Sequence, residues 1–221
     1  MTHVLVLRPD PGASATVARA RGLGLAAVAL PLFEIECVEW QTPEPSGFDG
    51  LLLTSANAVR CSGEQLQLLG SLKVYAVGKA TAETAREAGL DIAATGEDGV
   101  DRLLGSIDPD LRLLHPSGAH RHEPSDAKQA ITAVTVYRSE EIAAPDLSDA
   151  CGSIALVHSP RAGRRFAELV SDRSSIVVAA ISKAAAAAAG LGWKTVAIAD
   201  EPSDDALLAL AARLCNKPDP E

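Results

Sequence analysis

A repeat inside the chain constrains its fold more than any other feature of the sequence. Three short motifs occur twice, in the same order, and the two copies are 104 positions apart. The pairs are Leu53–Ala58 with Val157–Ala162, Val77–Ala80 with Ile181–Ala184, and Asp101–Leu104 with Asp205–Leu208. The alternative explanation is that strand ends resemble one another in all α/β sequences. Agreement in both order and spacing favours two similar domains.

Short apolar runs alternate with helical patterns along almost the whole chain, which is typical of helices layered on parallel sheets. The predicted strands are His3–Leu7, Leu25–Leu30, Gly50–Leu53, Val74–Val77, Ile92–Ala94, Arg112–Leu114, Ile154–Val157, Ile176–Ile181 and Val196–Ala199. The predicted helices are Ser14–Arg21, Asn57–Leu69, Thr81–Ala88, Val100–Ser106, Gly163–Val170, Lys183–Ala189 and Asp204–Cys215.

Two segments outside the repeat, Pro31–Val38 and Ile131–Arg138, have the alternating pattern of extended strands. They flank the middle of the chain, and an inserted domain needs two such crossings because its ends lie close together. The expected organisation is a discontinuous α/β domain, an inserted α/β domain and an antiparallel linker of two strands. Their expected bounds are 1–33 with 140–221, then 40–131, and about 32–38 with 132–139.

Composition excludes several classes of protein. The 221 residues are 47% hydrophobic, which is too apolar for a disordered chain. Asp and Glu number 29 against 20 Lys and Arg, the net charge is −9, and only 3% of residues are aromatic, so a nucleic-acid partner is not expected. No apolar stretch reaches the roughly 18 residues of a membrane span, and the N-terminus lacks the apolar core of a signal peptide.

The cysteines are scattered and form no C-x-x-C pair. Without a secretory context this pattern predicts reduced thiols in a cytoplasmic protein, with a disulfide pair as the minor alternative. The cysteines are Cys37, Cys61, Cys151 and Cys215.

Three motifs that resemble known sites do not fit them. The glycine-rich segments Gly22–Ala27 and Gly190–Thr195 each lead into a strand, which is the reverse of the order that dinucleotide or phosphate binding needs. A third group of side chains could supply metal ligands, but no element fixes their geometry and no metal is expected. That group is His115, His120, His122 and Glu123.

Small hydroxyl residues recur where predicted strands lead into helices. They are Thr54, Ser55, Thr81 after Gly78, Ser159 after His158, and Ser182. Ligands of parallel α/β sheets bind at the carboxyl ends of strands, where helix N-termini hold anions with free N–H groups. Each residue alone could equally be a helix N-cap. Their repetition in both halves favours anion recognition.

A wider set of motifs occurs in a fixed order between residue 3 and about residue 214. The set is Leu7–Pro9, Pro31–Phe33, Phe48–Ala58, Val77–Ala82, Val136–Arg138, Ser159–Pro160, Ala180–Lys183, Gly192–Trp193 and Glu201–Leu208. In this order they resemble the uroporphyrinogen-III synthase family. The resemblance implies two flavodoxin-like parallel-sheet domains joined by a two-stranded antiparallel linker.

The resemblance also implies the reaction. Hydroxymethylbilane, a linear tetrapyrrole with eight carboxylates, closes to uroporphyrinogen III with loss of water and inversion of its terminal ring, through a spiro intermediate. Uncatalysed closure gives the type I isomer, so catalysis is largely orientation. No cofactor, nucleic acid or membrane is implied. We expect a cytoplasmic monomer, with transient contact to the preceding enzyme of the pathway as a further expectation.

Site residues follow from the same resemblance. Tyr137 matches the family's connector tyrosine and is the candidate acid, because a phenol can donate a proton to the leaving hydroxyl. The alternative is an aromatic ring that packs at a hinge. The candidate substrate-binding residues are Arg8, Thr54, Ser55, Asn57, Gly78, Lys79, Thr81, Ser117, Gly118, Ser159, Ser182 and Lys183.

The chain departs from the family at three places. Ala185 stands where a threonine is common and Ser182 where glycine is usual. The stretch Ser117–Glu123 is expected to form a substrate-facing loop, with a shortened helix before Ile131. In that loop Arg121 and the histidines, together with Arg8, could add positive potential.

Two other functions fit part of the sequence. A non-catalytic hinge module that binds an anionic metabolite is the first, but such modules normally carry an effector domain for which 221 residues leave no room. A response-regulator-like interaction domain is the second, and it needs an acidic cluster where Arg8-Pro9-Asp10 offers one carboxylate. Because the net charge repels a polycarboxylate, we also expect most acidic residues to lie away from the interdomain cleft.

Overall fold

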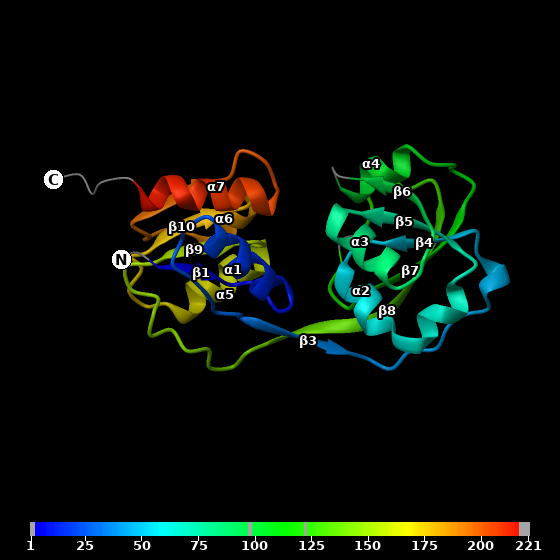
Figure 1. Cartoon of the computed structure of the whole chain (residues 1–221), viewed down its shortest axis with the longest axis horizontal. Coiled ribbons are helices and arrows are strands. Elements are labelled where there is room, and N and C mark those ends of the chain that lie inside the picture. The colour runs from blue at the N-terminus through cyan, green and yellow to red at the C-terminus, as the bar shows by residue number, and fades with distance from the viewer. Residues whose placement is uncertain (1–2, 97–98, 122, 217–221) are drawn as a thin grey trace. The chain divides into compact units, whose positions relative to one another are not determined.

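The structure, a computed structural model, describes residues 3–96, 99–121 and 123–216. The chain divides into two compact units, of which unit 1 comprises residues 1–34 and 141–221 and unit 2 comprises residues 35–140. Each unit is built on one sheet with helices on its faces (Figure 1). The predicted mixed α/β fold with two parallel-rich sheets is confirmed.

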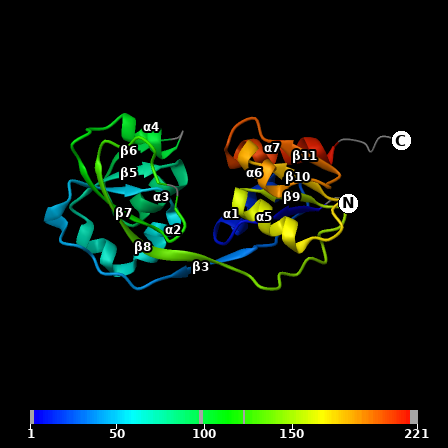
Figure 2. The ribbon, with the colours of Figure 1, turned by 180° about the vertical axis from the view of Figure 1, so that it is seen from behind.

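Unit 1 has a five-stranded sheet in the order β11-β10-β9-β1-β2, and its recorded strand pairs are parallel. Its strands are β1 (Val4–Val6), β2 (Ala27–Ala29), β9 (Ile154–Val157), β10 (Val177–Ala180) and β11 (Thr195–Ile198), the last labelled in the view from behind (Figure 2). The inner strands β1 and β9 are fully apolar and buried on both faces, as expected for a covered parallel sheet.

Four helices cover this sheet: α1 (Gly12–Gly22), α5 (Pro160–Leu169), α6 (Lys183–Ala189) and α7 (Asp204–Cys215). Buried side chains of α1 and α7 pack on one face and those of α5 and α6 on the other. Helices α5 and α6 approach closely at Gly163, which has no side chain. A Cβ at this position would come within 2.9 Å of the Ala185 carbonyl oxygen.

Unit 2 has a six-stranded sheet in the order β3-β8-β7-β4-β5-β6. Its strands are β3 (Phe33–Cys37), β4 (Gly50–Leu53), β5 (Lys73–Val77), β6 (Ile92–Gly96), β7 (Arg112–Gly118) and β8 (Ala130–Glu141). The first two residues of β3 and the last of β8 belong to unit 1.

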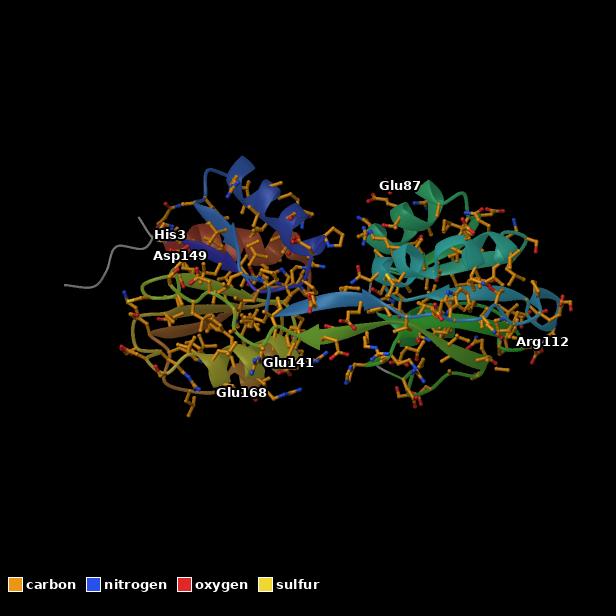
Figure 3. The ribbon with its side chains drawn as sticks, turned by 90° about the horizontal axis from the view of Figure 1, so that it is seen from below. His3, Glu87, Arg112, Glu141, Asp149 and Glu168 are labelled. Carbon is orange, nitrogen blue, oxygen red and sulfur yellow. A yellow bond between two sulfur atoms is a disulfide. The ribbon has the colours of Figure 1, made fainter. Side chains whose placement is uncertain are left out.

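The helices of unit 2 are α2 (Ala56–Ser62), α3 (Lys79–Glu87) and α4 (Val100–Gly105), with 3-10 helices η1 (Pro45–Gly47) and η2 (Gly63–Leu69). Helices α2 and α3 pack on one face of the sheet and α4 on the other. Where β7 begins, Arg112 (labelled in Figure 3) forms a two-pronged ion pair with Asp49, which precedes β4. This pair marks the amino ends of these strands, opposite the edge that carries the predicted site residues.

Five strands of each sheet correspond in spatial order, but the chain begins at a different strand of that order in each unit. In unit 1 the spatial order β11-β10-β9 continues into β1 and β2, and in unit 2 the order β6-β5-β4 continues into β7 and β8. The repeated motifs lie in β9 to α7 and in β4 to α4. The remaining two strands therefore precede the repeat in unit 1 and follow it in unit 2, which is a circular permutation.

Three predicted segments differ in the structure. Residues Ser117 and Gly118 belong to strand β7 and not to a loop, because the long β8 pairs with β7 through Gly118. The predicted helix Asn57–Leu69 is a short α-helix followed by 3-10 turns, since Gly63 has a positive φ of 56°. Described residues 119–121 and 123–129 contain no helix.

The cysteine prediction was wrong for one pair. Cys37 of β3 and Cys61 of α2 form a disulfide, with their Cα atoms 4.9 Å apart. The sequence carries no sign of this pairing, because the packing of α2 beside β3 brings together residues 24 positions apart. Cys151 and Cys215 are free thiols. Among the described residues, no helix is long and apolar enough to cross a membrane.

Candidate functional site

In unit 1 three predicted residues follow the carboxyl ends of neighbouring strands β1, β9 and β10. Arg8 comes after β1, Ser159 after β9 and Ser182 after β10. Both serines cap helices: Ser159 accepts a hydrogen bond from Ala162 N at 3.1 Å, and Ser182 accepts one from Ala185 N at 3.2 Å. The N-cap alternative therefore holds for both, although each hydroxyl keeps its own proton to donate.

One departure from the family pattern in this region, Ala185, lies in the core. Ala185 of α6, which stands where threonine is common, is fully buried, and its carbonyl oxygen lies against Gly163 of α5. A larger side chain there would have to fit into this buried position. Lys183, the first residue of α6, is exposed.

A buried carboxylate joins several side chains at this edge of unit 1. Asp204, the first residue of α7, has a side chain that is 13% exposed. Its Oδ1 lies 2.7 Å from His158 Nε2, and its Oδ2 accepts a hydrogen bond from the Thr16 hydroxyl at 2.9 Å. Arg19 forms an ion pair with Oδ2, and an Arg8 nitrogen lies 3.9 Å from Oδ1.

The protonation state of His158 follows from its surroundings. Burial, and then the positive charge of Arg8, lowers the pKa of His158 to about 3, although the contact of Nδ1 with the Leu156 carbonyl oxygen opposes that shift. The ring is therefore neutral at pH 7. The short contact to a carboxylate assigns the single ring proton to Nε2, which donates to Asp204.

In unit 2 the start of α3 differs from the serine-capped helices. Its N-cap is Gly78, which has a positive φ of 84° and no side chain to accept from the first turn. Thr81 is the third residue of the helix and is buried, and Lys79 is exposed. An α-helix that starts without a side-chain cap leaves backbone N–H groups for an anion.

Three predicted residues, Thr54, Ser55 and Asn57, lie in the turn after β4 and at the start of α2, and one of them contacts a histidine. Ser55 caps α2 by accepting from Asn57 N at 3.2 Å. The Thr54 hydroxyl shares a 3.0 Å hydrogen bond with His115 Nε2. Burial, aided by the charge of Arg121, lowers the pKa of His115 to about 4, so this ring is also neutral at pH 7.

The candidate acid, Tyr137, lies beside another predicted residue. Strand β8 has a register shift where Ser117 pairs with Thr135 and Gly118 pairs with Tyr137. The Tyr137 ring covers Gly118, since a Cβ there would lie 2.7 Å from the ring carbon Cζ. Among the described residues, the Tyr137 hydroxyl has no hydrogen-bond partner, so its proton is available to a bound molecule.

Ser117, by contrast, is 1% exposed, and its hydroxyl lies 3.5 Å from the Val134 carbonyl oxygen. Two surface depressions of about 720 and 460 Å³ contain none of the predicted residues. Within the described ranges, no three His, Cys, Asp or Glu side chains gather as metal ligands do. His122, a member of the candidate metal-ligand group, lies outside those ranges.

Sequence reasoning missed the side chains that surround Arg8. Asp204 follows Ser203 at the start of a predicted helix, where an acidic residue is an ordinary partner of the helix dipole. Thr16 and Arg19 lie one turn apart on α1, and nothing in the sequence links them to Asp204, 188 positions beyond Thr16. His158, next to the predicted residue Ser159, was the one member of this cluster that the sequence placed near the predicted site.

Comparison with known proteins connects these features to a family. A family model described as uroporphyrinogen-III synthase HemD matches residues 14–209. The chain is similar to the crystal structure of uroporphyrinogen-III synthetase from Helicobacter pylori 26695, with a TM-score of 0.69 and 19% identity over 97% of this chain and 100% of that chain. A mutant uroporphyrinogen III synthase from the extremely thermophilic bacterium Thermus thermophilus has a TM-score of 0.56 and 19% identity over 98% and 100%.

None of the curated protein sequences matches the chain significantly. At 19% identity the solved structures show a shared fold, whereas the family model covers most of the sequence. The chain belongs to the uroporphyrinogen-III synthase family.

Proposed function

We propose that this protein is a cyclising hydro-lyase that converts hydroxymethylbilane to uroporphyrinogen III in tetrapyrrole biosynthesis. The match of the family model to residues 14–209 carries the proposal. The polar residues at the carboxyl ends of strands in both units fit it, because the substrate is a polycarboxylate.

The reaction needs little acid or base strength. The hydroxyl of hydroxymethylbilane leaves as water, and the substituted carbon of the terminal ring then attacks, so that the ring is inverted through a spiro intermediate. Tyr137 is the group proposed to protonate the leaving hydroxyl, and its unpartnered hydroxyl among the described residues supports this role. Holding the chain in the folded geometry supplies the rest of the catalysis. The proposed reaction requires no metal or organic cofactor.

Substrate carboxylates are proposed to bind at backbone N–H groups, hydroxyls and a few cations. The uncapped start of α3 at Gly78, with Lys79 and Thr81, supports this most directly. The serines Ser55, Ser159 and Ser182 bind in this proposal by donating the proton that their capping role leaves free. The remaining proposed contacts are Arg8, Thr54, Asn57, Ser117, Gly118 and Lys183.

The finer architecture belongs to the same proposal. Unit 1 has the strand order 2-1-3-4-5 in chain numbering, which is the flavodoxin-like order. Two hydrogen bonds support an antiparallel linker: Ile142 N donates to Leu32 O, and Val38 N donates to Val136 O. From the first pair to the second, one residue number rises by as much as the other falls, which is the register of antiparallel strands. We infer domains close to residues 1–33 with 140–221 and 40–131.

The biological setting is also proposed from the family. We expect a monomer in the cytoplasm that binds a small polycarboxylate and no nucleic acid. Transient contact with the preceding pathway enzyme would protect an unstable substrate.

The decisive experiment is an isomer assay. Purified protein is given hydroxymethylbilane, the product is oxidised to the porphyrin, and the type I and type III isomers are separated. We expect type III to form faster than type I forms in buffer alone. Only type I at the spontaneous rate would contradict the proposal and would leave a non-catalytic binding module as the alternative.

A further inference from the structure

Arg8 is held in a setting that a side chain placed only for stability would avoid. Its guanidinium lies against Gly12, the first residue of α1, where a Cβ would come within 2.6 Å of Nε and 2.8 Å of Cζ. Partial burial lowers the pKa of Arg8, and the charge of Arg19 adds to that effect. The positive end of the α1 dipole also disfavours a cation at this position.

Nothing in the described part of the protein satisfies the donors of Arg8. Its one ion-pair contact there is the 3.9 Å approach to Asp204, and among the described residues it has no hydrogen bond. Asp204 already accepts from His158 and Thr16 and pairs with Arg19. The carboxylate of Asp10, two residues along the chain, accepts from Ser14.

Arg19 provides the contrast within the same cluster. It is paired with both Asp204 and Asp205, so its positive charge is compensated by the protein. Arg8 has the same chemistry, is 39% exposed and, among the described residues, keeps its planar fork of N–H donors without a hydrogen-bond acceptor. A fork of this kind matches a carboxylate that arrives from solvent.

We propose that Asp204 and Gly12 are positioning residues that hold Arg8 as a two-pronged clamp for one carboxylate of the substrate. Gly12 leaves the space that the guanidinium occupies, and Asp204, fixed by His158, Thr16 and Arg19, attracts Arg8 without saturating it. This inference rests on the proposed function, because it takes the tetrapyrrole side-chain carboxylate as its ligand.

The test begins with Gly12→Ala and a matched control, Gly22→Ala. Both glycines lie in α1 with ordinary backbone angles, but a Cβ on Gly22 meets nothing within 4 Å. Alanine at residue 12 displaces the tip of a flexible side chain, so folding stability should hold while the clamp is lost. We expect about a tenfold higher KM for hydroxymethylbilane with little change in kcat, as expected for a lost charge-assisted contact. Gly22→Ala should keep the wild-type KM.

A double-mutant cycle separates positioning from a structural effect. Arg8→Met should raise KM by a similar factor, Arg8→Lys should rescue it only in part, and Gly12→Ala should add nothing in the Arg8→Met background. Asp204→Asn keeps an acceptor for His158 and removes the negative charge that attracts Arg8. It should therefore raise KM when Arg8 is present and leave KM unchanged in the Arg8→Met background. Melting curves are recorded for every variant.

An unchanged KM in Gly12→Ala, or effects that simply add in the double variants, would overturn the inference. A fall in melting temperature with no change in KM for Asp204→Asn would overturn the role of Asp204. These outcomes are read from enzyme whose wild type forms the type III isomer. Failure of the clamp is therefore distinct from failure of the proposed function, in which wild type forms none.

Discussion

At the scale of single residues, the two tyrosines of the chain have similar packing and different expected roles. Tyr137 covers Gly118, and Tyr75 covers Gly50 in the same way, with a Cβ on Gly50 placed 2.7 Å from a Tyr75 ring carbon. Each glycine leaves room for an aromatic ring to pack against the backbone of a neighbouring strand. Tyr137 differs because it follows the bulge that sets it opposite Gly118, near the carboxyl end of β7.

This difference predicts the effect of removing each hydroxyl. Tyr137→Phe keeps the packing on Gly118 and removes the proposed acid, so kcat should fall on the order of 100-fold with an unchanged melting temperature. Tyr75→Phe is the matched control and should keep full activity. The measurement is the initial rate of type III formation. Unchanged turnover in Tyr137→Phe would remove this residue from the mechanism and leave the fold assignment intact.

His115 predicts a pH dependence of stability. The folded protein holds the pKa of this 2% exposed ring at about 4, whereas the unfolded chain has the ordinary value of 6.5. The unfolded state therefore binds the proton first as the pH falls, and stability is lost between pH 6.5 and about 4. The shift corresponds to about 3 kcal/mol.

The check is urea unfolding of His115→Gln across this pH range. Glutamine can keep a hydrogen bond to Thr54 and does not titrate, so its stability should fall less steeply toward acid than that of wild type. His120→Gln is the control, because His120 is exposed and should leave the wild-type slope. An equally steep slope in His115→Gln would show that other groups cause the acid lability.

At the scale of elements, sequence patterns predict strands and caps better than pairings. The buried runs Val4–Val6 and Ile154–Val157 and the capping serines follow from local composition, so their elements were predictable. The extension of β7 through Gly118 depends on its pairing with the separate strand β8, and the network at Asp204 depends on α1 packing beside α7. Contacts that bring together distant parts of the sequence leave no periodic signal.

The disulfide between β3 and α2 is another such contact, and it predicts a change in stability. Closing a loop of 24 residues stabilises a protein by about 3 kcal/mol in the chain-entropy model. Cys37→Ser with Cys61→Ser should lose that amount in urea unfolding without reductant, and reduced wild type should match the double variant. Cys151→Ser, which removes an exposed free thiol, should unfold as wild type does. Four titratable thiols in unreduced, denatured protein would contradict the disulfide.

At the scale of the whole molecule, the repeat and the charge have separate consequences. The permuted sheets explain why the repeat covers three strands and not five: the other two strands occur at opposite ends of the repeat in the two units. The net charge of −9 repels a substrate with eight carboxylates. The proposed binding at local donors, such as Arg8 and the start of α3, is therefore expected to supply the attraction that the net charge does not.

Long-range repulsion and local attraction respond differently to salt. The screening length falls from about 30 Å at about 0.01 M salt to about 8 Å at about 0.15 M, whereas direct contacts are screened much less. We expect kcat/KM for hydroxymethylbilane to rise over this range.

Glu87→Lys tests whether long-range repulsion causes this rise. Glu87 is exposed at the far end of α3 (Figure 3), roughly 12 Å along the helix from Lys79. This change moves the net charge from −9 to −7, so kcat/KM should increase at low salt and converge on wild type at about 0.15 M. A fall of kcat/KM with salt in both proteins would mean that local cations already govern the encounter with the substrate.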